Sequence, residues 1–138
     1  TTSWWRVIDG RFVAIWAMNV THAAYDLMVA PEAELNDGCF DIIVLRDNVS
    51  RAQVLAVFLA LEKGTHLDMP CVEYYKASEM IWEPLCEEGI FDVDGELSGV
   101  GPATLPNLPK QHRGKVLPFA YEKVHMKVQR AAQRMLVP

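Results

Sequence analysis

Short apolar runs rich in β-branched and aromatic residues mark the first third of the chain. Residues 11–20 (RFVAIWAMNV) are mostly apolar, which predicts a buried strand rather than a helix. Residues 4–8 precede them across Asp9-Gly10, a dipeptide typical of two-residue turns, so a hairpin is expected. A second Asp-Gly pair, Asp37-Gly38, precedes residues 39–45 (CFDIIVL), which predicts a second buried strand.

One segment has the pattern of a helix. Ser50 is a favourable residue for its start, and Gly64 suits the left-handed position beyond its end. The residues at positions 54, 57, 58 and 61 form one apolar stripe, which Leu55 and Leu59 widen to a nearly all-round apolar surface. Such a helix is either enclosed in the core or faces an apolar ligand, and the pattern leaves both interpretations open.

The rest of the chain predicts further strands. Residues 71–76, 77–83 and 90–93 are short runs bounded by proline, glycine or acidic turns, and residues 124–128 alternate apolar with polar. Another strand is expected at residues 134–137. Residues 98–118 are rich in proline and glycine and predict a surface loop or insertion. About eight strands with one helix predict a mainly β fold, an antiparallel β-sandwich with one main α-helix.

Length and composition indicate a packed domain. The chain has 138 residues, of which 51% are hydrophobic and 22% charged. No apolar run is long enough to span a bilayer, and the start lacks both Met and a signal-peptide pattern, which predicts a fragment or a processed chain. Three cysteines without a CxxC pair favour a reducing, cytoplasmic setting.

Charge is unevenly distributed along the sequence. The net charge is −5, but from Pro106 onwards seven basic residues stand against one acid. This basic tail either pairs with the acidic body or meets phosphates or an anionic membrane surface. Basic residues interleaved with aromatic residues are missing from it, so no nucleic-acid partner is expected.

The sharpest local pattern is Asp92-Val93-Asp94-Gly95-Glu96. Alternate residues of a strand share a face, so the three carboxylates would project together for a divalent cation or for general base chemistry. An ordinary solvated hairpin turn is the alternative. The four histidines are dispersed and no glycine-rich phosphate loop occurs, so nucleophilic catalysis and unaided nucleotide binding have no support.

Several segments together, in order, resemble one family. Residues 36–44 (NDGCFDIIV) look like the "DGxxD/H" strand of the diacylglycerol kinase catalytic superfamily, and residues 59–66 (LALEKGTH) resemble a helix end of sphingosine kinases. Residues 91–96 (FDVDGE) look like their "VDGE" strand, and Thr21-His22 and Ala30-Pro31 fit the segment before the first motif. Residues 121–136, after a long insert, look most like plant-type long-chain base kinases.

The resemblance implies a place in a two-domain enzyme. The N-terminal domain of that family carries a GGDGT nucleotide loop, which is absent here, and the C-terminal β-sandwich binds lipid. Residues 1–138 would then be the distal part of the C-terminal domain, inactive without the missing N-terminal kinase domain. The full enzyme would transfer phosphate from ATP, with Mg²⁺, to the primary hydroxyl of a sphingoid base. It would be cytoplasmic, with transient peripheral association with membranes.

Two alternatives stay open beside this reading. The chain would otherwise be a non-catalytic, kinase-derived binding or assembly subunit. Within the enzyme class, a ceramide or diacylglycerol kinase is the nearest rival.

The resemblance also implies roles for matching residues. Asp94, Gly95 and Glu96 would face the nucleotide at an interdomain cleft. Asp37, with the backbone carbonyls of Glu34 and Cys39, matches a metal site of bacterial relatives. The lipid tunnel would be lined by seven residues: Trp16, Ala23, Val54, Val57, Phe58, Leu61 and His66. Trp16 is bulkier than the aliphatic residue usual there, so the tunnel would be shortened or redirected.

Overall fold

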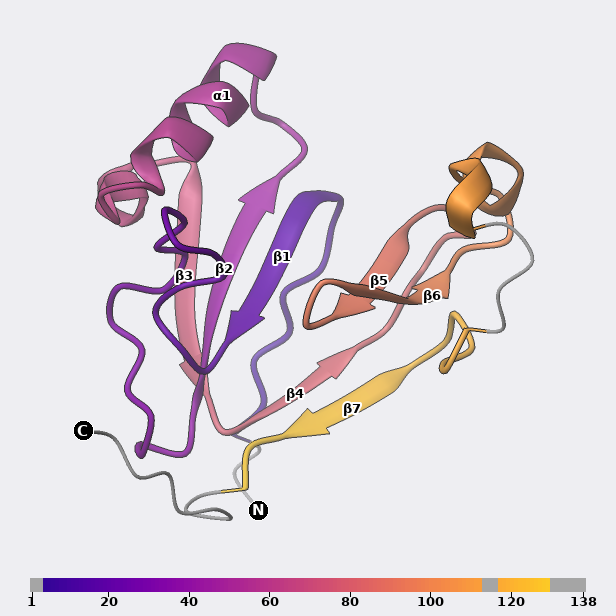
Figure 1. Cartoon of the computed structure of the whole chain (residues 1–138). Coiled ribbons are helices and arrows are strands. Elements are labelled where there is room, and N and C mark those ends of the chain that lie inside the picture. The colour runs from indigo at the N-terminus through magenta and orange to yellow at the C-terminus, as the bar shows by residue number, and fades with distance from the viewer. Residues whose placement is uncertain (1–3, 113–116, 130–138) are drawn as a thin grey trace. The chain divides into compact units, whose positions relative to one another are not determined.

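The computed structural model describes residues 4–112 and 117–129, which form seven strands, one α-helix and three short 3₁₀ helices (Figure 1). The chain divides into two compact units, one within residues 1–79 and 127–138 and the other within residues 80–126. The predicted mainly β class, with antiparallel sheets and one main α-helix, is confirmed.

The first unit is built on a three-stranded sheet. β2 (Phe40–Arg46) lies at its centre, between β1 (Phe12–Met18) and β3 (Val72–Ala77), and both pairings are antiparallel. Residues 42–45 of β2 are all buried, as expected for a continuous apolar run that is covered on both faces.

α1 (Arg51–Ala60) follows β2, and Ser50 caps its start, as predicted. The Ser50 side chain accepts a hydrogen bond from the Gln53 N–H, and the Gln53 side chain accepts one from the Ser50 N–H, which completes a capping box. Gly64 has the predicted left-handed conformation, with φ +67°, and precedes the 3₁₀ helix η1 (Thr65–Asp68). A Cβ on Gly64 would also lie 2.8 Å from Met28 Sδ, so glycine fits both the backbone and the space.

One face of the sheet carries the core of this unit. Ile43 lies on it, directly opposite Trp16 of β1 and Tyr74 of β3, and both neighbours pack against the core. The segment before β2 and the end of α1 cover this face. The buried centre consists of Val29, Ala30, Ile43 and Leu61.

The hairpin predicted before β1 is wrong. Residues 4–8 form no strand, and β1 pairs with β2 instead. A type I′ turn needs positive φ at both central residues. Gly10 has φ +128°, but among the described non-glycine residues only Asp94 has a positive φ, so Asp9 does not meet this condition. Arg46 fixes the corner, because its Nη1 donates to the Asp9 carbonyl at 2.6 Å.

The second unit contains two pairs of strands. β5 (Ile90–Val93) and β6 (Glu96–Val100) form an antiparallel hairpin, and β4 (Glu79–Trp82) pairs with β7 (Val124–Lys127). Trp82 stacks on Phe91 with ring centroids 5.1 Å apart. Tyr121 meets the Trp82 ring edge to face, and Phe119 meets Phe91 in the same way. These four rings give the unit an apolar centre of its own.

The loop predicted over residues 98–118 begins later than expected. Residues 98–100 end β6 and are buried. The glycines of this stretch suggested a loop, but directly after β6 a Cβ at Gly101 would lie 2.2 Å from the Glu87 carbonyl oxygen, so this glycine serves close backbone approach. Two 3₁₀ helices follow, η2 (Leu105–Asn107) and η3 (Lys110–His112). The insertion itself stays a prediction, and the strand expected at residues 134–137 lies outside the described residues.

Candidate functional site

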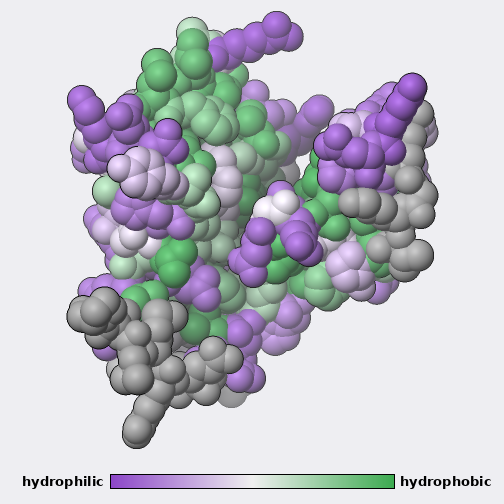
Figure 2. All heavy atoms as spheres, viewed as in Figure 1, coloured by the Kyte–Doolittle hydropathy of each residue, from purple (hydrophilic) through white to green (hydrophobic). Residues whose placement is uncertain are grey.

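α1 presents large apolar side chains both inwards and outwards. Val57 is fully buried, and so is Leu61 directly after the helix. By contrast, Leu55, Phe58 and Leu59 are 61%, 47% and 69% exposed. Hydrophobic residues gather visibly over this helix in Figure 2. The predicted stripe therefore divides into a part that packs in the core and a part that is open to a further apolar group.

Phe58 meets the sheet at Trp16. The two rings lie edge to face, with centroids 6.1 Å apart and an interplanar angle of 82°. Trp16 stands on the core face of the sheet, directly opposite Ile43. The aromatic pair therefore forms the junction between the buried core and the exposed apolar surface of α1.

His66 is enclosed beside this core. It is fully buried, and its Nε2 lies 2.8 Å from the Val29 carbonyl oxygen. Its Nδ1 is buried and has no hydrogen-bond partner among the described residues. With Nε2 donating to the carbonyl, Nδ1 keeps its lone pair. Burial lowers the pKa of His66, so the ring is held in its neutral form.

Two residues of the predicted tunnel are less enclosed. Val54 is half-buried on α1, and Ala23 is exposed in the segment between β1 and β2. This segment is tied to the end of the helix, because the Met28 N–H donates to the Leu61 carbonyl at 2.9 Å. The structure thus brings Trp16 and Phe58 together at the core, while Ala23 lies outside it.

Asp37, the predicted metal ligand, is engaged by a lysine. Its Oδ1 accepts a hydrogen bond from the Cys39 N–H at 2.9 Å, and its Oδ2 lies 2.8 Å from Lys76 Nζ. The Asp37 carboxylate raises the pKa of Lys76, so the ammonium stays charged. Within residues 4–112 and 117–129, no three His, Cys, Asp or Glu side chains form a group suited to a metal ion. The metal role of Asp37 stays a prediction, and the ammonium would compete with a metal for the same oxygen.

Sequence reasoning missed the partners of Asp41. Asp41 is fully buried in β2, where Tyr74 donates a hydrogen bond to its Oδ1 and Lys76 Nζ lies 3.6 Å from the same oxygen. Burial, together with the Asp41 carboxylate, raises the pKa of Tyr74. The available signal was an acid within a strongly apolar strand, because a buried carboxylate requires polar partners.

Asp94 and Gly95 form the tight turn between β5 and β6. Their φ values are +53° and +76°, which is the left-handed pair that a type I′ turn requires. A Cβ at Gly95 would meet nothing within 4 Å, so glycine is favoured there by the backbone alone. Asp94, Gly95 and Glu96 are all exposed, which leaves both carboxylates accessible to a ligand.

The expectation that three carboxylates share one face is wrong. Glu96 pairs with Val93, and Asp92 pairs with Leu97, so Asp92 and Glu96 point to opposite faces of the hairpin. The tight turn at Asp94 reverses the chain between them. Asp92 instead lines a hollow of about 220 Å³ beside the turn, together with Gly95, His112 and four apolar or proline residues: Ile90, Leu97, Leu108 and Pro109.

The sequence of the chain matches one described family. The family of the YegS C-terminal NAD kinase beta sandwich-like domain matches residues 5–120. The chain belongs to this family. Its description as a β-sandwich-like domain agrees with the antiparallel sheets of both units.

The relatives of this chain include sphingosine kinases from distant organisms. Human sphingosine kinase 2 is 37% identical over 100 residues, which cover 71% of this chain and 15% of that protein. Arabidopsis thaliana sphingosine kinase 1 is 35% identical over 103 residues, covering 70% and 21%. Dictyostelium discoideum sphingosine kinase B is 32% identical over 107 residues, covering 75% and 14%. The similarity to the C-terminal part of sphingosine kinases is confirmed, and these identities do not single out the plant-type enzymes.

The chain spans a quarter or less of each of these relatives. Within the described part of this family member, no helix is long and apolar enough to cross a membrane, since α1 has only 10 residues.

Proposed function

We propose that this chain is the lipid-binding C-terminal portion of a kinase that phosphorylates the primary hydroxyl of a sphingoid base with ATP. The observation that carries the proposal is the exposed apolar surface of α1, seated on Trp16 through Phe58. A long alkyl chain gains about 0.8 kcal/mol for each CH₂ that it buries, so such a surface is a sufficient binding element. The relatives named as sphingosine kinases support the reaction class.

The alkyl chain would run along α1 at the Phe58–Trp16 contact, beside the buried core. Phe58 and Trp16 would contact it first, and the neutral imidazole of His66 would lie near its closed end. Val57 and Leu61 already pack in the core, so they would support the wall of the tunnel. The full proposed lining is Trp16, Ala23, Val54, Val57, Phe58, Leu61 and His66.

The nucleotide would meet the other unit of the chain. Asp94, Gly95 and Glu96 are exposed at the β5–β6 turn, where carboxylate oxygens would accept hydrogen bonds from ribose hydroxyls or from an arginine of the N-terminal kinase domain. When bound, Mg²⁺ would neutralise the phosphates of ATP. The turn residues would then orient the nucleotide and would form no covalent bond with it.

The chain alone would be inactive and would act beside an N-terminal kinase domain. It would work in the cytoplasm, where the free cysteines Cys39, Cys71 and Cys86 stay reduced. Transient membrane association would deliver the lipid, and the exposed Leu55 and Leu59 of α1 are suited to contact an acyl surface.

Photo-crosslinking with a diazirine-bearing sphingoid base tests the proposal in the full-length protein. Adducts are expected on α1 or β1, at or beside Phe58 and Trp16, and excess sphingosine should abolish them. A parallel assay with radiolabelled ATP should show phosphate transfer to sphingosine in preference to ceramide or diacylglycerol. Adducts confined to residues 80–126 would contradict the lipid site.

The two measurements also separate the alternatives. Crosslinking on α1 without phosphate transfer to any of the three lipids would favour a non-catalytic, kinase-derived binding subunit. Preferred transfer to ceramide or diacylglycerol would keep the enzyme class and overturn the sphingoid base.

A further inference from the structure

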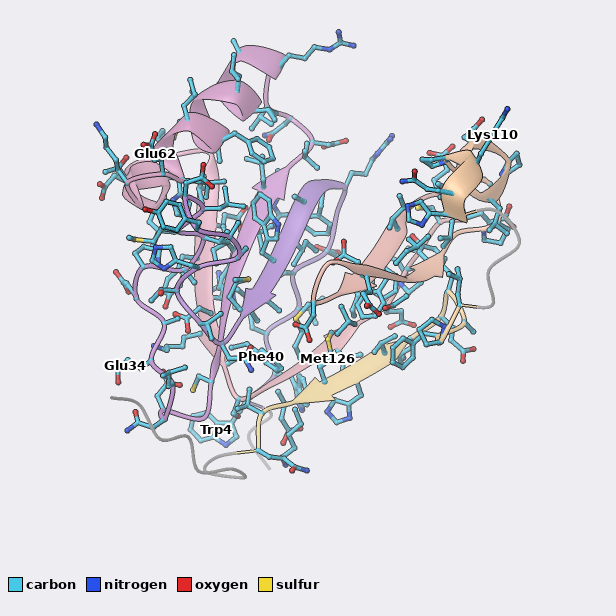
Figure 3. All side chains as sticks on the ribbon, viewed as in Figure 1. Trp4, Glu34, Phe40, Glu62, Lys110 and Met126 are labelled. Atoms are coloured by element: carbon cyan, nitrogen blue, oxygen red, sulfur yellow. The ribbon has the colours of Figure 1, made fainter. Side chains whose placement is uncertain are left out.

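A polar cluster lies at one end of the core face, and it shares no residue with the proposed lipid and nucleotide sites. Asp41 of β2 is directly opposite Lys76 of β3, so both side chains stand on the same face of the sheet. The segment that leads into β2 contributes Glu32 and Asp37. Figure 3 shows Glu34 of this segment and Phe40, the first residue of β2, toward the same end of the sheet.

Three oxygen atoms surround the ammonium of Lys76. Asp37 Oδ2 lies at 2.8 Å, the Glu32 carbonyl oxygen at 3.2 Å and Asp41 Oδ1 at 3.6 Å. Two carboxylates and a backbone carbonyl are also the donors that a hard divalent cation prefers. The cluster therefore has the oxygen set of a cation site, with a lysine nitrogen at its centre.

Burial favours a cation at this point. Asp41 is fully buried, and its Oδ2 has no hydrogen-bond partner among the described residues. The Asp37 side chain is only 19% exposed. Both carboxylates face the same ammonium, and its positive charge offsets their mutual repulsion.

We propose that the ε-ammonium of Lys76 is the resident cation of this cluster and takes the place of the divalent metal that the family resemblance implies for Asp37. A metal ion bonded to Asp37 Oδ2 would have to lie beside the ammonium, and like charges at that separation repel strongly. Lys76 thereby fastens the segment before β2 to β3 without any metal. The proposal does not depend on the kinase reaction.

The proposal implies that removing the ammonium creates a vacancy for a metal. Lys76→Ala leaves two carboxylates and a carbonyl with no positive charge beside them. These oxygen atoms would suit Ca²⁺, because Ca²⁺ accepts oxygen ligands in irregular geometry. Lys76→Arg keeps the charge and should not create the site. Lys63→Ala is a matched control, because Lys63 is an exposed lysine in the turn after α1.

Thermal melting of the full-length protein, in EDTA and in millimolar Ca²⁺, tests this directly. For the wild type, Lys76→Arg and Lys63→Ala, the melting temperature of each protein should be the same in EDTA as in Ca²⁺. Lys76→Ala should melt several degrees lower than the wild type in EDTA and regain part of that loss in Ca²⁺. Calorimetry should show Lys76→Ala binding Ca²⁺ at least tenfold more tightly than Lys63→Ala does.

Two results would overturn the proposal. One is a wild-type protein that carries one equivalent of divalent metal after purification, or that melts lower in EDTA. The other is Lys76→Ala that binds Ca²⁺ no better than the control. If Lys76→Ala does not fold, the metal content and EDTA response of the wild type and of Lys76→Arg still decide the question.

Discussion

His66 and Val29 are joined inside the core by a hydrogen bond, with His66 Nε2 2.8 Å from the Val29 carbonyl oxygen. The two residues come from different segments, η1 after the helix and the stretch before β2. Their bond therefore links the two segments that cover the core face of the sheet. It also leaves the buried Nδ1 without a partner among the described residues, so a proton on that nitrogen would be costly.

The stability of the fold should fall as the pH drops below about 6.5, the ordinary pKa of histidine. Burial lowers the pKa of folded His66, so the unfolded chain binds the proton more readily than the folded one. The contribution of His66 to the free energy of unfolding is complete at neutral pH and is lost between about pH 6.5 and the lower pKa of the folded state. Over this range the free energy of unfolding changes by at most about 1.4 kcal/mol per pH unit.

Urea unfolding of the wild type and of His66→Gln across this range measures the effect. Glutamine keeps a side-chain N–H for the Val29 carbonyl but has no titrating group. Above about pH 5, the free energy of unfolding of the variant should therefore no longer depend on pH. Below about pH 5, carboxylates begin to titrate and contribute in both proteins. Identical slopes in the two proteins would show that His66 is not the responsible group.

Phe58→Ala should weaken binding of a long-chain base more than it weakens the fold. The ring is about half exposed and meets the core through its edge-to-face contact with Trp16. We therefore expect a loss of about 1–2 kcal/mol in the free energy of unfolding, below the roughly 3–5 kcal/mol typical of a buried aromatic residue. Binding of the base should fall at least tenfold, or about 1.4 kcal/mol.

Leu85→Ala is the control for Phe58→Ala, because Leu85 is an exposed apolar residue in the other unit. It should change neither quantity. A large drop in the melting temperature of Phe58→Ala with an unchanged Michaelis constant for the base would assign the ring to the core alone.

Two glycines of the second unit should respond differently to alanine. At Gly101 a Cβ would lie 2.2 Å from the Glu87 carbonyl oxygen, so the backbone itself must move. At Gly95 a Cβ has open space, and only the φ of +76° disfavours it. We expect Gly101→Ala to cost about 3 kcal/mol or more and Gly95→Ala about 1–2 kcal/mol, measured by unfolding. Equal costs would mean that the strand ends are not packed as closely as described.

The sequence predicted the elements whose signals are local. The start of α1 depends on Ser50 and Gln53, which cap the helix by themselves, and the burial of β2 follows from its unbroken apolar run. The Asp94-Gly95 turn was equally predictable, because two adjacent residues determine its conformation. The same dipeptide misled at Asp9-Gly10, where a distant residue, Arg46, holds the Asp9 carbonyl instead.

The candidate site was only partly predictable for the same reason. Periodicity places Val57, Phe58 and Leu61 on one stripe of the helix, but it does not tell which of them the rest of the chain covers. The pairing of Asp41 with Lys76 depends on the register of β2 and β3, which joins residues far apart in sequence. Pairings of that kind are set by tertiary contacts, so the local sequence pattern does not predict that a lysine occupies the predicted metal site.

Asp94→Asn in the full-length protein should lower turnover at least tenfold, roughly 1.4 kcal/mol of barrier, if the turn faces the nucleotide. Asparagine adopts the left-handed conformation of this position readily, so the type I′ turn and the stability of the hairpin should be retained. The substitution thus removes one negative charge without disturbing the backbone. Asp92→Asn is the matched control, because it removes a charge from the same hairpin on the face opposite to Glu96. A kinase assay at saturating sphingoid base, with ATP varied, should show the loss for Asp94→Asn alone. Equal turnover in the wild type and both variants would make the turn an ordinary solvated hairpin end.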